Sequence, residues 1–332
     1  MNETVPRIWV LLGDRTGDNN QVLALAEALG LPFETRTLRY NFLRALSGRI
    51  LGSRILSLRS SSRQWLTPPW PDLVIAIGRR SVPVARWIRR QNRGLTKVVR
   101  VGHPRMDPRI FDLVITTRQY PVPPGDNVVL LPVAMSRYRQ PPTPTQPELE
   151  WLEALPRPHL LMSVGGATKY WQLDADSVAD TACLLAARAS QSDGSLIVVG
   201  SRRTNPALMD AIEEALAGKQ HCHFAPREVR FAVLLGDADE NFVTGDSVSM
   251  LSEAVLAGRP VGLVPIALNA KGERALGRSG GDTLRRDLRR FWDHLQEQGL
   301  VGTLEAPATN AVEDPAQAAA AAVRNLLGDL VE

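Results

Sequence analysis

Three polar residues that follow an apolar run, Ser247, Ser249 and Glu253, have the spacing of a site for an anion joined to a sugar. Residues 241–264 predict a strand, a turn, a helix and a second strand, with both serines at the start of the helix. The N–H groups of a helix N-terminus bind anions, and a carboxylate one turn later can reach the hydroxyls of an attached sugar. A nucleoside diphosphate has both groups. An ordinary N-capped helix between two buried strands is the alternative.

Two further loops in the second half of the chain carry residue types that bind phosphate. Gly165 and Gly166 allow backbone N–H groups to approach a phosphate closely, and Lys169 adds a positive charge. Ser201 and Arg202 follow the next predicted strand, where Arg202 offers forked N–H donors. Because the carboxyl ends of parallel strands meet at one edge of a sheet, we expect the three loops to converge on a single rim. A plain glycine turn with a solvated lysine is the simpler interpretation of the first loop.

The first half of the chain carries candidates for proton transfer. Asp14 and Asp18 lie in the loop GDRTGDNNQ, directly after the first predicted strand, and this loop has neither the GxGxxG nor the Walker A pattern. One of the two carboxylates could act as a general base towards a hydroxyl nucleophile, and the choice between them stays open. Asp18 could instead cap the helix that follows. His103, in a Gly/Pro loop after another strand, is a third candidate, although a lone histidine is more often structural.

Short apolar runs alternate with helical patterns along the chain, which predicts parallel sheets covered on both faces. Residues 139–158 include six prolines, which resist regular structure, with a short helical run inside, and the stretch indicates a linker. We therefore expect an α/β protein with two doubly wound Rossmann-like domains. The expected parts are residues 1–140, a linker at 141–157, and residues 158–332 with a C-terminal helix at 315–330. The predicted strands are 8–12, 32–38, 73–77, 97–101, 112–116, 128–131, 159–164, 196–199, 222–224, 241–243 and 261–264.

Several predicted helices bear on these candidates. A helix is expected at 21–29 after the aspartate loop, and another at 249–257 with Glu253 inside it. Helices are also expected at 40–46 and 283–297.

The net charge of +4 conceals an asymmetry between the two halves of the chain. Residues 1–140 hold 22 Lys+Arg against 9 Asp+Glu, and residues 36–63 hold seven arginines and no acidic residue. This distribution indicates an anionic partner, such as nucleic acid, lipid headgroups or phosphorylated small molecules. Only 5% of residues are aromatic and none form a stacking platform among the basic residues. We therefore expect no specific nucleic-acid partner.

The cysteines, the length of the apolar runs and the N-terminal segment together predict a cytoplasmic protein. Two distant cysteines, Cys183 and Cys222, have neither a disulfide nor a metal spacing, which suits a reducing compartment. No apolar run approaches the roughly 20 residues that cross a bilayer, and the N-terminal segment predicts a first strand and not a signal peptide.

Several segments carry a resemblance to known proteins. SEAVLAGRP (252–260) is similar to the S-E-x-x-x-x-G-x-P stretch of the GT-B enzyme that adds N-acetylglucosamine in peptidoglycan synthesis, whose glutamate binds ribose; this implies the same role for Glu253. A resemblance over nearly the whole chain is to the bacterial branch of the mitochondrial-fission "elongated mitochondria" family. It implies a GT-B fold, with the two Rossmann-like domains facing across a cleft. The matching segments include GDRTGDNNQVLALAEALG (13–30), SVGGATKYW (163–171), GSRRTNP (200–206) and VTGDSVSMLSEA (243–254).

The chain departs from that family in two places. Residues 116–121, TTRQYP, stand where many relatives have a Pro-x-His-Asp-like segment, and Phe291-Trp292 replaces an aromatic–histidine pair. Roles on the acceptor side at these positions are not carried over.

These observations predict a GT-B glycosyltransferase-like protein that binds a nucleotide sugar and transfers the sugar to an anionic acceptor, lipid-linked or part of the cell envelope. We expect no metal and no cofactor apart from this donor substrate, and a cytoplasmic protein at the periphery of the inner membrane. The alternative is a non-catalytic adaptor or scaffold on the same fold. The candidate catalytic residues are Asp18, Asp14 and His103, and the candidate donor-binding residues are Gly165, Gly166, Lys169, Ser201, Arg202, Ser247, Ser249 and Glu253.

Overall fold

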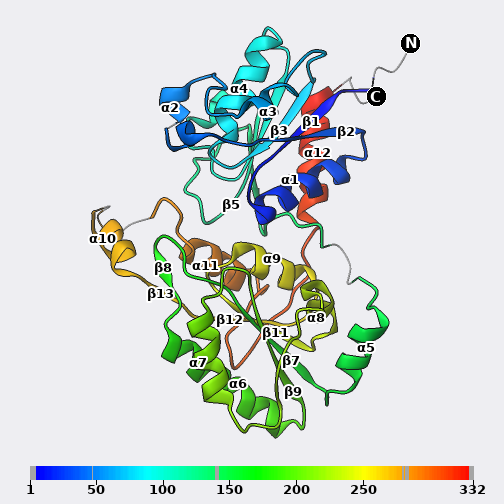
Figure 1. The fold of residues 1–332 in the computed structure, drawn as a ribbon, viewed down its shortest axis with the longest axis vertical. Coiled ribbons are helices and arrows are strands. Elements are labelled where there is room, and N and C mark those ends of the chain that lie inside the picture. The colour runs from blue at the N-terminus through cyan, green and yellow to red at the C-terminus, as the bar shows by residue number, and fades with distance from the viewer. Residues whose placement is uncertain (1–4, 47, 139–141, 279, 281–283, 329–332) are drawn as a thin grey trace. The chain divides into compact units, whose positions relative to one another are not determined.

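The structure is a computed structural model that describes residues 5–46, 48–138, 142–278, 280 and 284–328. The chain divides into two compact units, each with its own parallel sheet and covering helices (Figure 1). The first unit comprises Met1–Arg137 and Glu313–Glu332, and the second comprises Tyr138–Val312. The expected class, α/β with two doubly wound Rossmann-like domains, is confirmed.

The described residues of the first unit form a parallel sheet in the order β2-β1-β3-β4-β5-β6. Strands buried on both faces are mostly apolar, and β5 is buried at every position. The continuous apolar runs in the sequence therefore located these strands closely. The strands are β1 (Ile8–Leu12), β2 (Phe33–Thr37), β3 (Leu73–Ile77), β4 (Lys97–Val101), β5 (Leu113–Thr117) and β6 (Val128–Leu131).

Helices cover both faces of the first sheet. Helix α1 (Thr16–Leu29) packs against α12 (Pro315–Leu327) on one face, and alternate strand residues such as Val10 join this cluster. Helix α4 (Ser81–Gln91) packs on the other face with Trp9 and its neighbours. Short helical pieces lie beside them: η1 (Phe42–Ala45), α2 (Gly48–Leu51), α3 (Ser60–Arg63) and η2 (Pro108–Ile110).

The C-terminal helix corrects the expected domain boundaries. The sequence analysis assigned residues 158–332 to one domain, but α12 packs in the core of the first unit, beside α1 in Figure 1. Arg324 also donates a hydrogen bond to the carbonyl of Ala28 at the end of α1, at 2.7 Å. The alanine-rich surface of α12 meets small residues of α1, such as Ala24, so the two helices pack closely. The chain therefore crosses between the units twice.

The second unit has a parallel sheet in the order β10-β9-β7-β11-β12. Helices α6 and α7 pack on one face of it, while α8 and α9 contact β7 and β11 from the other. Its strands are β7 (His159–Val164), β9 (Ser195–Gly200), β10 (Cys222–Phe224), β11 (Glu240–Thr244) and β12 (Val261–Val264), with an antiparallel pair β8 (Trp171–Gln172) and β13 (Ala267–Leu268) beside it. Its helices are α5 (Gln146–Glu153), α6 (Ala175–Gln191), α7 (Pro206–Leu216), α8 (Phe231–Asp237), α9 (Val248–Leu256), α10 (Ala270–Arg278) and α11 (Arg289–Glu297).

The proline-rich stretch expected as a linker at 141–157 contains a helix, as its helical run predicted, and this helix belongs to the second unit and not to a separate linker. Helix α5 begins with a capping box in which Thr145 and Glu148 hydrogen-bond reciprocally. Arg230 then binds Glu148 at 2.6 Å and, with these hydrogen bonds, holds the pKa of that carboxyl well below its usual range. Reciprocal capping and a long-range ion pair thus order a segment whose composition disfavours regular structure.

The helices differ most from expectation in three places. The helix expected at 283–297 begins at Arg289, and its first predicted residue lies outside the described part of the chain. The helix expected at 40–46 is the 3₁₀ turn η1. Helix α1 begins at Thr16, five residues earlier than expected, which places Asp18 inside its first turn and not at the cap. Among the described residues, no helix is long and apolar enough to span a bilayer.

Candidate functional site

Each sheet has one point at which the strand order reverses, and ligands of open α/β sheets bind beyond the strand ends at such points. In the second sheet the chain runs from β7 outward to β9 and β10, then returns to β11 on the other side of β7. In the first sheet it runs from β1 outward to β2, then returns to β3. The switch points therefore lie between β7 and β11 and between β1 and β3.

The two glycines that follow β7 are packed tightly at the switch point of the second sheet. A Cβ atom on Gly165 would collide with the carboxylate of Asp246, and one on Gly166 would collide with the carbonyl oxygen of Arg203. The N–H of Gly165 donates to Thr244 Oγ1 at 2.8 Å, and that of Gly166 donates to Asp246 Oδ2 at 3.0 Å. Glycine is needed here because the loops after β7, β9 and β11 come into direct contact.

Asp246 is the group around which these loops assemble. Its side chain is fully buried and accepts hydrogen bonds from Thr244 Oγ1 at 2.7 Å and from the Gly166 N–H. The guanidinium of Arg203, half exposed, lies 3.2 Å from the same carboxylate. Burial raises the pKa of Asp246, and these hydrogen bonds and the charge of Arg203 oppose the rise.

These contacts change the roles that the sequence indicated for two positions. The N–H groups of Gly165 and Gly166 were expected to face a phosphate, but both donate to side chains of the β11 loop. Arg203 was not a candidate, yet it contacts Asp246, although it is as much a surface residue as its exposed neighbour Arg202. One sequence signal could have pointed to Arg203. Asp246 is an acidic residue just after a buried strand, and a buried carboxylate requires a cation nearby.

The start of α9 lies on the same rim. Ser247 is the N-cap, and its side chain accepts a hydrogen bond from the Met250 N–H at 3.4 Å. Ser249 and Glu253 follow at a spacing of four residues, so they share one face of the helix, and both are partly exposed. The charge of Glu253 reaches Tyr138: burial raises the pKa of Tyr138 to about 12, Arg259 opposes the rise, and Glu253 adds to it.

The other candidates of the second unit are placed less centrally. Ser201 contacts Thr204 Oγ1 at 3.1 Å and accepts a hydrogen bond from the Arg203 N–H, which shapes the β9 loop. Lys169 lies with its ammonium 4.7 Å from the ring centroid of Tyr170, a cation–π contact outside the Asp246 cluster. The structure thus brings Gly165, Gly166, Ser201 and Ser247 together, while Lys169 and Arg202 stand apart.

An aromatic pair supports the turn between β11 and α9. Trp292 Nε1 donates to the carbonyl oxygen of Gly245 at 2.9 Å, and a Cβ at that glycine would lie 2.7 Å from the indole ring. Trp171 meets Trp292 edge to face, with 4.9 Å between ring centroids. The Phe-Trp dipeptide that departs from the family pattern therefore has a structural contact in this chain: its tryptophan fixes the backbone next to Asp246.

The switch point of the first sheet gathers the candidate bases. Asp14 forms an exposed ion pair with Arg80 at 3.2 Å. Asp18 lies beside the loop after β3, since its Oδ2 would be 3.5 Å from a Cβ on Gly78. Gly78 has a φ of +78°, a left-handed conformation that favours glycine. Both aspartates and the β3 loop therefore meet at one place.

Arg100, another residue that the sequence did not single out, lies buried beneath this rim. Its guanidinium donates to the carbonyl oxygens of Gly78 at 3.0 Å and of His103 at 2.9 Å. Burial lowers the pKa of Arg100 to about 10, with the charges of Tyr120 and Asp18 opposing the decrease. The side chain therefore stays positive at neutral pH, when it favours the ionised form of nearby carboxylates.

His103 has a geometry that suits hydrogen-bond donation better than proton abstraction. Its Nδ1 accepts a hydrogen bond from the Arg105 N–H at 2.9 Å, so the proton of the neutral ring lies on Nε2. The ring meets Tyr120 edge to face at 5.4 Å between centroids. The only nitrogen lone pair of the neutral ring is engaged, which makes the aspartates better candidates for the base. Across the described residues, no group of three or more His, Cys, Asp or Glu side chains has the arrangement of a metal site.

The chain belongs to the mitochondrial fission ELM1 family, whose profile it matches over residues 16–327. It is 27% identical over 281 residues to the mitochondrial fission protein ELM1 of Arabidopsis thaliana, covering 76% of this chain and 61% of that protein. It is 33% identical over 109 residues to the uncharacterized protein RP120 of Rickettsia prowazekii (strain Madrid E), covering 32% of this chain and 30% of that one. The matched regions thus span less than two thirds of both relatives. The resemblance inferred from the motifs is confirmed.

Solved structures with the same fold include enzymes of UDP-sugar metabolism. A putative UDP-N-acetylglucosamine 2-epimerase from Listeria monocytogenes matches with a TM-score of 0.58 at 13% identity, over 96% of each chain. The S. aureus MnaA–UDP complex matches with a TM-score of 0.54 at 11% identity, over 94% of each chain. The Neisseria meningitidis UDP-GlcNAc 2-epimerase bound to UDP-GlcNAc matches with 0.53 at 12%, over 97% of this chain and 99% of that one. At these identities the likeness establishes the GT-B-like fold.

Proposed function

We propose that this protein binds a nucleotide sugar at the switch point of its second sheet and transfers the sugar to an anionic acceptor. The observation that carries the proposal is the Asp246 cluster, in which the loops after β7, β9 and β11 lock together directly beside the start of α9. Open α/β sheets bind nucleotides at this position. The solved structures of the same fold that hold UDP or UDP-GlcNAc support the ligand class.

The diphosphate would lie at the N-terminus of α9. The first N–H groups of a helix lack intrahelical acceptors, and Ser247 takes only the N–H of Met250. Val248 and Ser249 would therefore donate to phosphate oxygens, and the half-exposed guanidinium of Arg203 would add a charge. Glu253, one turn further along α9, would accept hydrogen bonds from the ribose hydroxyls. Arg202 and Lys169 would approach only the outer phosphate oxygens.

Transfer would proceed by attack of an acceptor hydroxyl on the anomeric carbon. The acceptor oxygen–carbon bond forms as the bond from that carbon to the diphosphate breaks, and an aspartate of the first unit takes the hydroxyl proton. Asp14 and Asp18 are the two candidates for this base. The helix N-terminus and Arg203 would stabilise the departing diphosphate without a metal. The basic first unit suits an acceptor that carries phosphate or carboxylate, lipid-linked at the inner membrane surface.

A thermal-shift panel tests the donor site. Melting temperature is measured with UDP, UDP-GlcNAc, GDP, ADP and CMP at millimolar concentration, for the wild type and for Glu253→Ala. A ligand at about 100 times its dissociation constant stabilises a protein by about 2.7 kcal/mol, so at least one nucleotide should raise the melting temperature clearly. Glu253→Ala should reduce that shift, while Glu297→Ala, an exposed glutamate at the end of α11, should leave it unchanged.

A second candidate is a non-catalytic scaffold on the same fold, and one observation favours it. The N–H groups of Gly165 and Gly166 are occupied by side chains of the protein itself, so the β7 loop is not an open phosphate cradle. On this hypothesis none of the nucleotides would shift the melting temperature of the wild type. That result would remove the support for the transferase.

A further inference from the structure

One segment of the first unit, residues 42–65, concentrates exposed apolar side chains. Single exposed apolar residues are normal on a protein surface, whereas a cluster of them marks an interaction site. Ten large apolar side chains are exposed among the described residues, and five of these lie in this one segment. Phe42 is 84% exposed and Ile50 is 64% exposed. The five residues are Phe42, Leu46, Ile50, Leu56 and Trp65.

Four of the five side chains lie in a loop whose ends are tied together. Tyr40 and Leu58 form an antiparallel bridge, and the Asn41 N–H donates to the carbonyl of Ser57 at 2.9 Å. The Asn41 side chain also donates to the carbonyl of Leu56 at 2.8 Å. We call residues 41–57 the basic loop. Because its base is fixed and Leu51 within it is buried, its exposed side chains project from an anchored element.

Positive charge surrounds these apolar side chains. Residues 36–63 contain seven arginines and no acidic residue, and Arg44, Arg54 and Arg59 are exposed. Other arginines hold the loop backbone: Arg63 donates to the carbonyl of Leu56 at 3.0 Å, and Arg86 donates to that of Gly52 at 3.4 Å. Apolar side chains framed by guanidinium groups are complementary to an anionic lipid surface. The apolar side chains enter the acyl boundary, and the guanidinium groups bind the headgroups.

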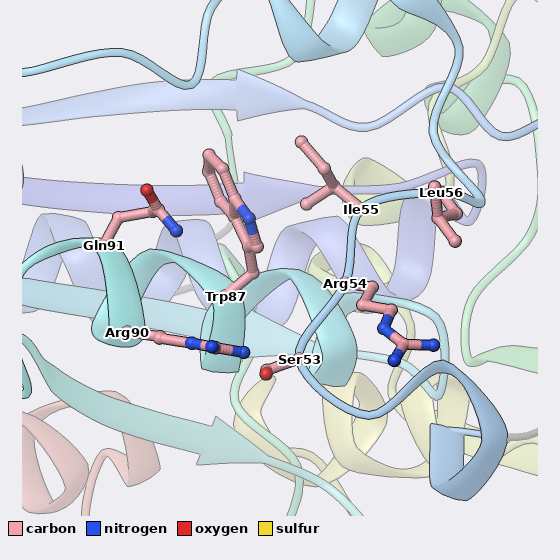
Figure 2. Close-up of a pocket in the computed structure, with 7 residues that line it drawn as sticks. All are labelled: Ser53, Arg54, Ile55, Leu56, Trp87, Arg90 and Gln91. Atoms are coloured by element: carbon pink, nitrogen blue, oxygen red, sulfur yellow. The ribbon is translucent and has the colours of Figure 1, made fainter.

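A cavity of about 460 Å³ lies where the basic loop meets helix α4. Figure 2 shows its lining, with Ser53 to Leu56 on the loop side and Trp87, Arg90 and Gln91 on the α4 side. The guanidinium groups of Arg54 and Arg90 form no hydrogen bond or ion pair with any other described residue. The unused donors of these two cations, which line the cavity from the loop and from α4, suit the phosphates of lipid headgroups.

We infer that the basic loop, together with Trp65 and this cavity, docks on an anionic phospholipid bilayer. Phe42, Leu46 and Ile50 enter the acyl boundary, and Arg54 and Arg90 bind headgroup phosphates. The exposed set is mainly aliphatic, which favours a bilayer over single-stranded nucleic acid, whose bases need aromatic side chains for stacking. The inference goes beyond the proposed function, because docking on the bilayer requires no nucleotide.

Co-flotation of the full chain with vesicles tests the inference in the absence of nucleotide. The protein should bind vesicles of phosphatidylcholine mixed with phosphatidylglycerol, and should bind pure phosphatidylcholine at least about tenfold more weakly. Phe42→Ser combined with Ile50→Ser should weaken partitioning by about tenfold or more. Arg54→Glu combined with Arg90→Glu should do the same on the mixed vesicles, and added salt should weaken wild-type binding.

Matched controls separate this surface from general stickiness. Leu95→Ser replaces an equally exposed leucine of the same unit, and Lys219→Glu combined with Arg227→Glu reverses two exposed charges of the second unit. Both should leave vesicle binding unchanged, as should Glu253→Ala, which separates this inference from the donor site. Apart from Glu253, which is partly exposed, the substituted side chains are exposed, so the melting temperatures of these variants should stay near that of the wild type.

Three results would overturn the inference. The first is failure of the wild type to bind the mixed vesicles. The second is equal loss of binding in the control variants and in the basic-loop variants. The third is a change of oligomeric state in Phe42→Ser combined with Ile50→Ser without a change in vesicle binding, which would assign the surface to a second copy of the chain.

Discussion

Each sheet keeps one buried charged side chain beneath its switch point, and the two charges are opposite. Asp246 is fully buried below the β7–β11 rim, and Arg100 is 2% exposed below the β1–β3 rim. An unpaired buried charge would be very costly, and both groups are held by hydrogen bonds and by opposite charges nearby. Such perturbed groups at strand ends are typical of functional sites. In this protein they hold the backbone of the loops that would contact ligands.

The pH dependence of stability should report the burial of Asp246. Because its folded pKa is raised, the folded state holds this proton more tightly than the unfolded chain, whose aspartates titrate near about 3.9. Its contribution to stability is therefore present at acid pH and is lost as the pH rises from about 4 through the raised pKa. The melting temperature of the wild type minus that of Asp246→Asn should decrease over this range, measured by calorimetry.

Arg203→Met provides the comparison for this effect. Removing the cation leaves the carboxylate without its ion pair, so the pKa of Asp246 should rise further. In the Arg203→Met background, the decrease in melting-temperature difference between the parent and its Asp246→Asn variant should therefore extend to higher pH. A difference that instead grows towards neutral pH in the wild type would mean that the pairing with Arg203 outweighs burial.

The loop after β7 shows how one element depends on two others. It turns at Gly165 and Gly166 because the β11 loop supplies acceptors to both N–H groups, and the β9 loop fills the space next to Gly166. The loop after β1 is different: a Cβ on Gly13 would have no neighbour within 4 Å. Glycines at equivalent places in the two sheets therefore meet different structural requirements.

Gly166→Ala and Gly13→Ala should therefore differ in stability. The added methyl at Gly166 meets the backbone of Arg203, so the β9 loop must shift, and we expect a loss of about 1–3 kcal/mol in the free energy of unfolding. Gly13→Ala should be neutral or slightly stabilising. Chemical denaturation of both variants measures the difference, and equal stabilities would contradict the packing described for the second rim.

The first unit is built from two segments that lie far apart in the sequence, Met1–Arg137 and Glu313–Glu332. Helix α12 follows the second unit in sequence, yet its buried residues complete the face of the first sheet that α1 also covers. The first unit is therefore incomplete until the last helix has been added, which makes its folding depend on contacts of very long sequence separation.

Leu327→Ala should destabilise the first unit selectively. Leu327 is 4% exposed in the cluster shared by α1 and α12, and a cavity of this kind costs about 2–4 kcal/mol. Hydrogen exchange should accelerate in α1 and β1, while β7 and β11 keep their protection. Leu184→Ala, on an exposed side chain of α6, is the control. Faster exchange in the second unit would show that the two units unfold together.

Local sequence determined the strands and most of the helices, because strands buried on both faces are near-continuous apolar runs. Four strands of the first sheet, β1, β3, β4 and β6, and three of the second, β7, β10 and β12, begin and end where the apolar runs predicted. The placement of Asp14, Asp18 and the loops of the second unit at strand ends followed from the same alternation. Strand order, and hence the two switch points, required the sheets themselves.

Long-range contacts determined the features that the pattern could not specify. Arg203, and not Arg202, reaches Asp246. Which of two neighbouring loop residues faces the β11 loop depends on how the β9 loop packs against Gly166, and this packing exists only in the folded chain. The glycine N–H groups bond to Thr244 and Asp246, which lie about 80 positions away in the chain. Helix α12 packs in the first unit because its alanine-rich surface meets the small residues of α1. Periodicity in the sequence predicts which face of a helix or strand is buried. The segment of the chain that covers this face is decided only when the chain folds.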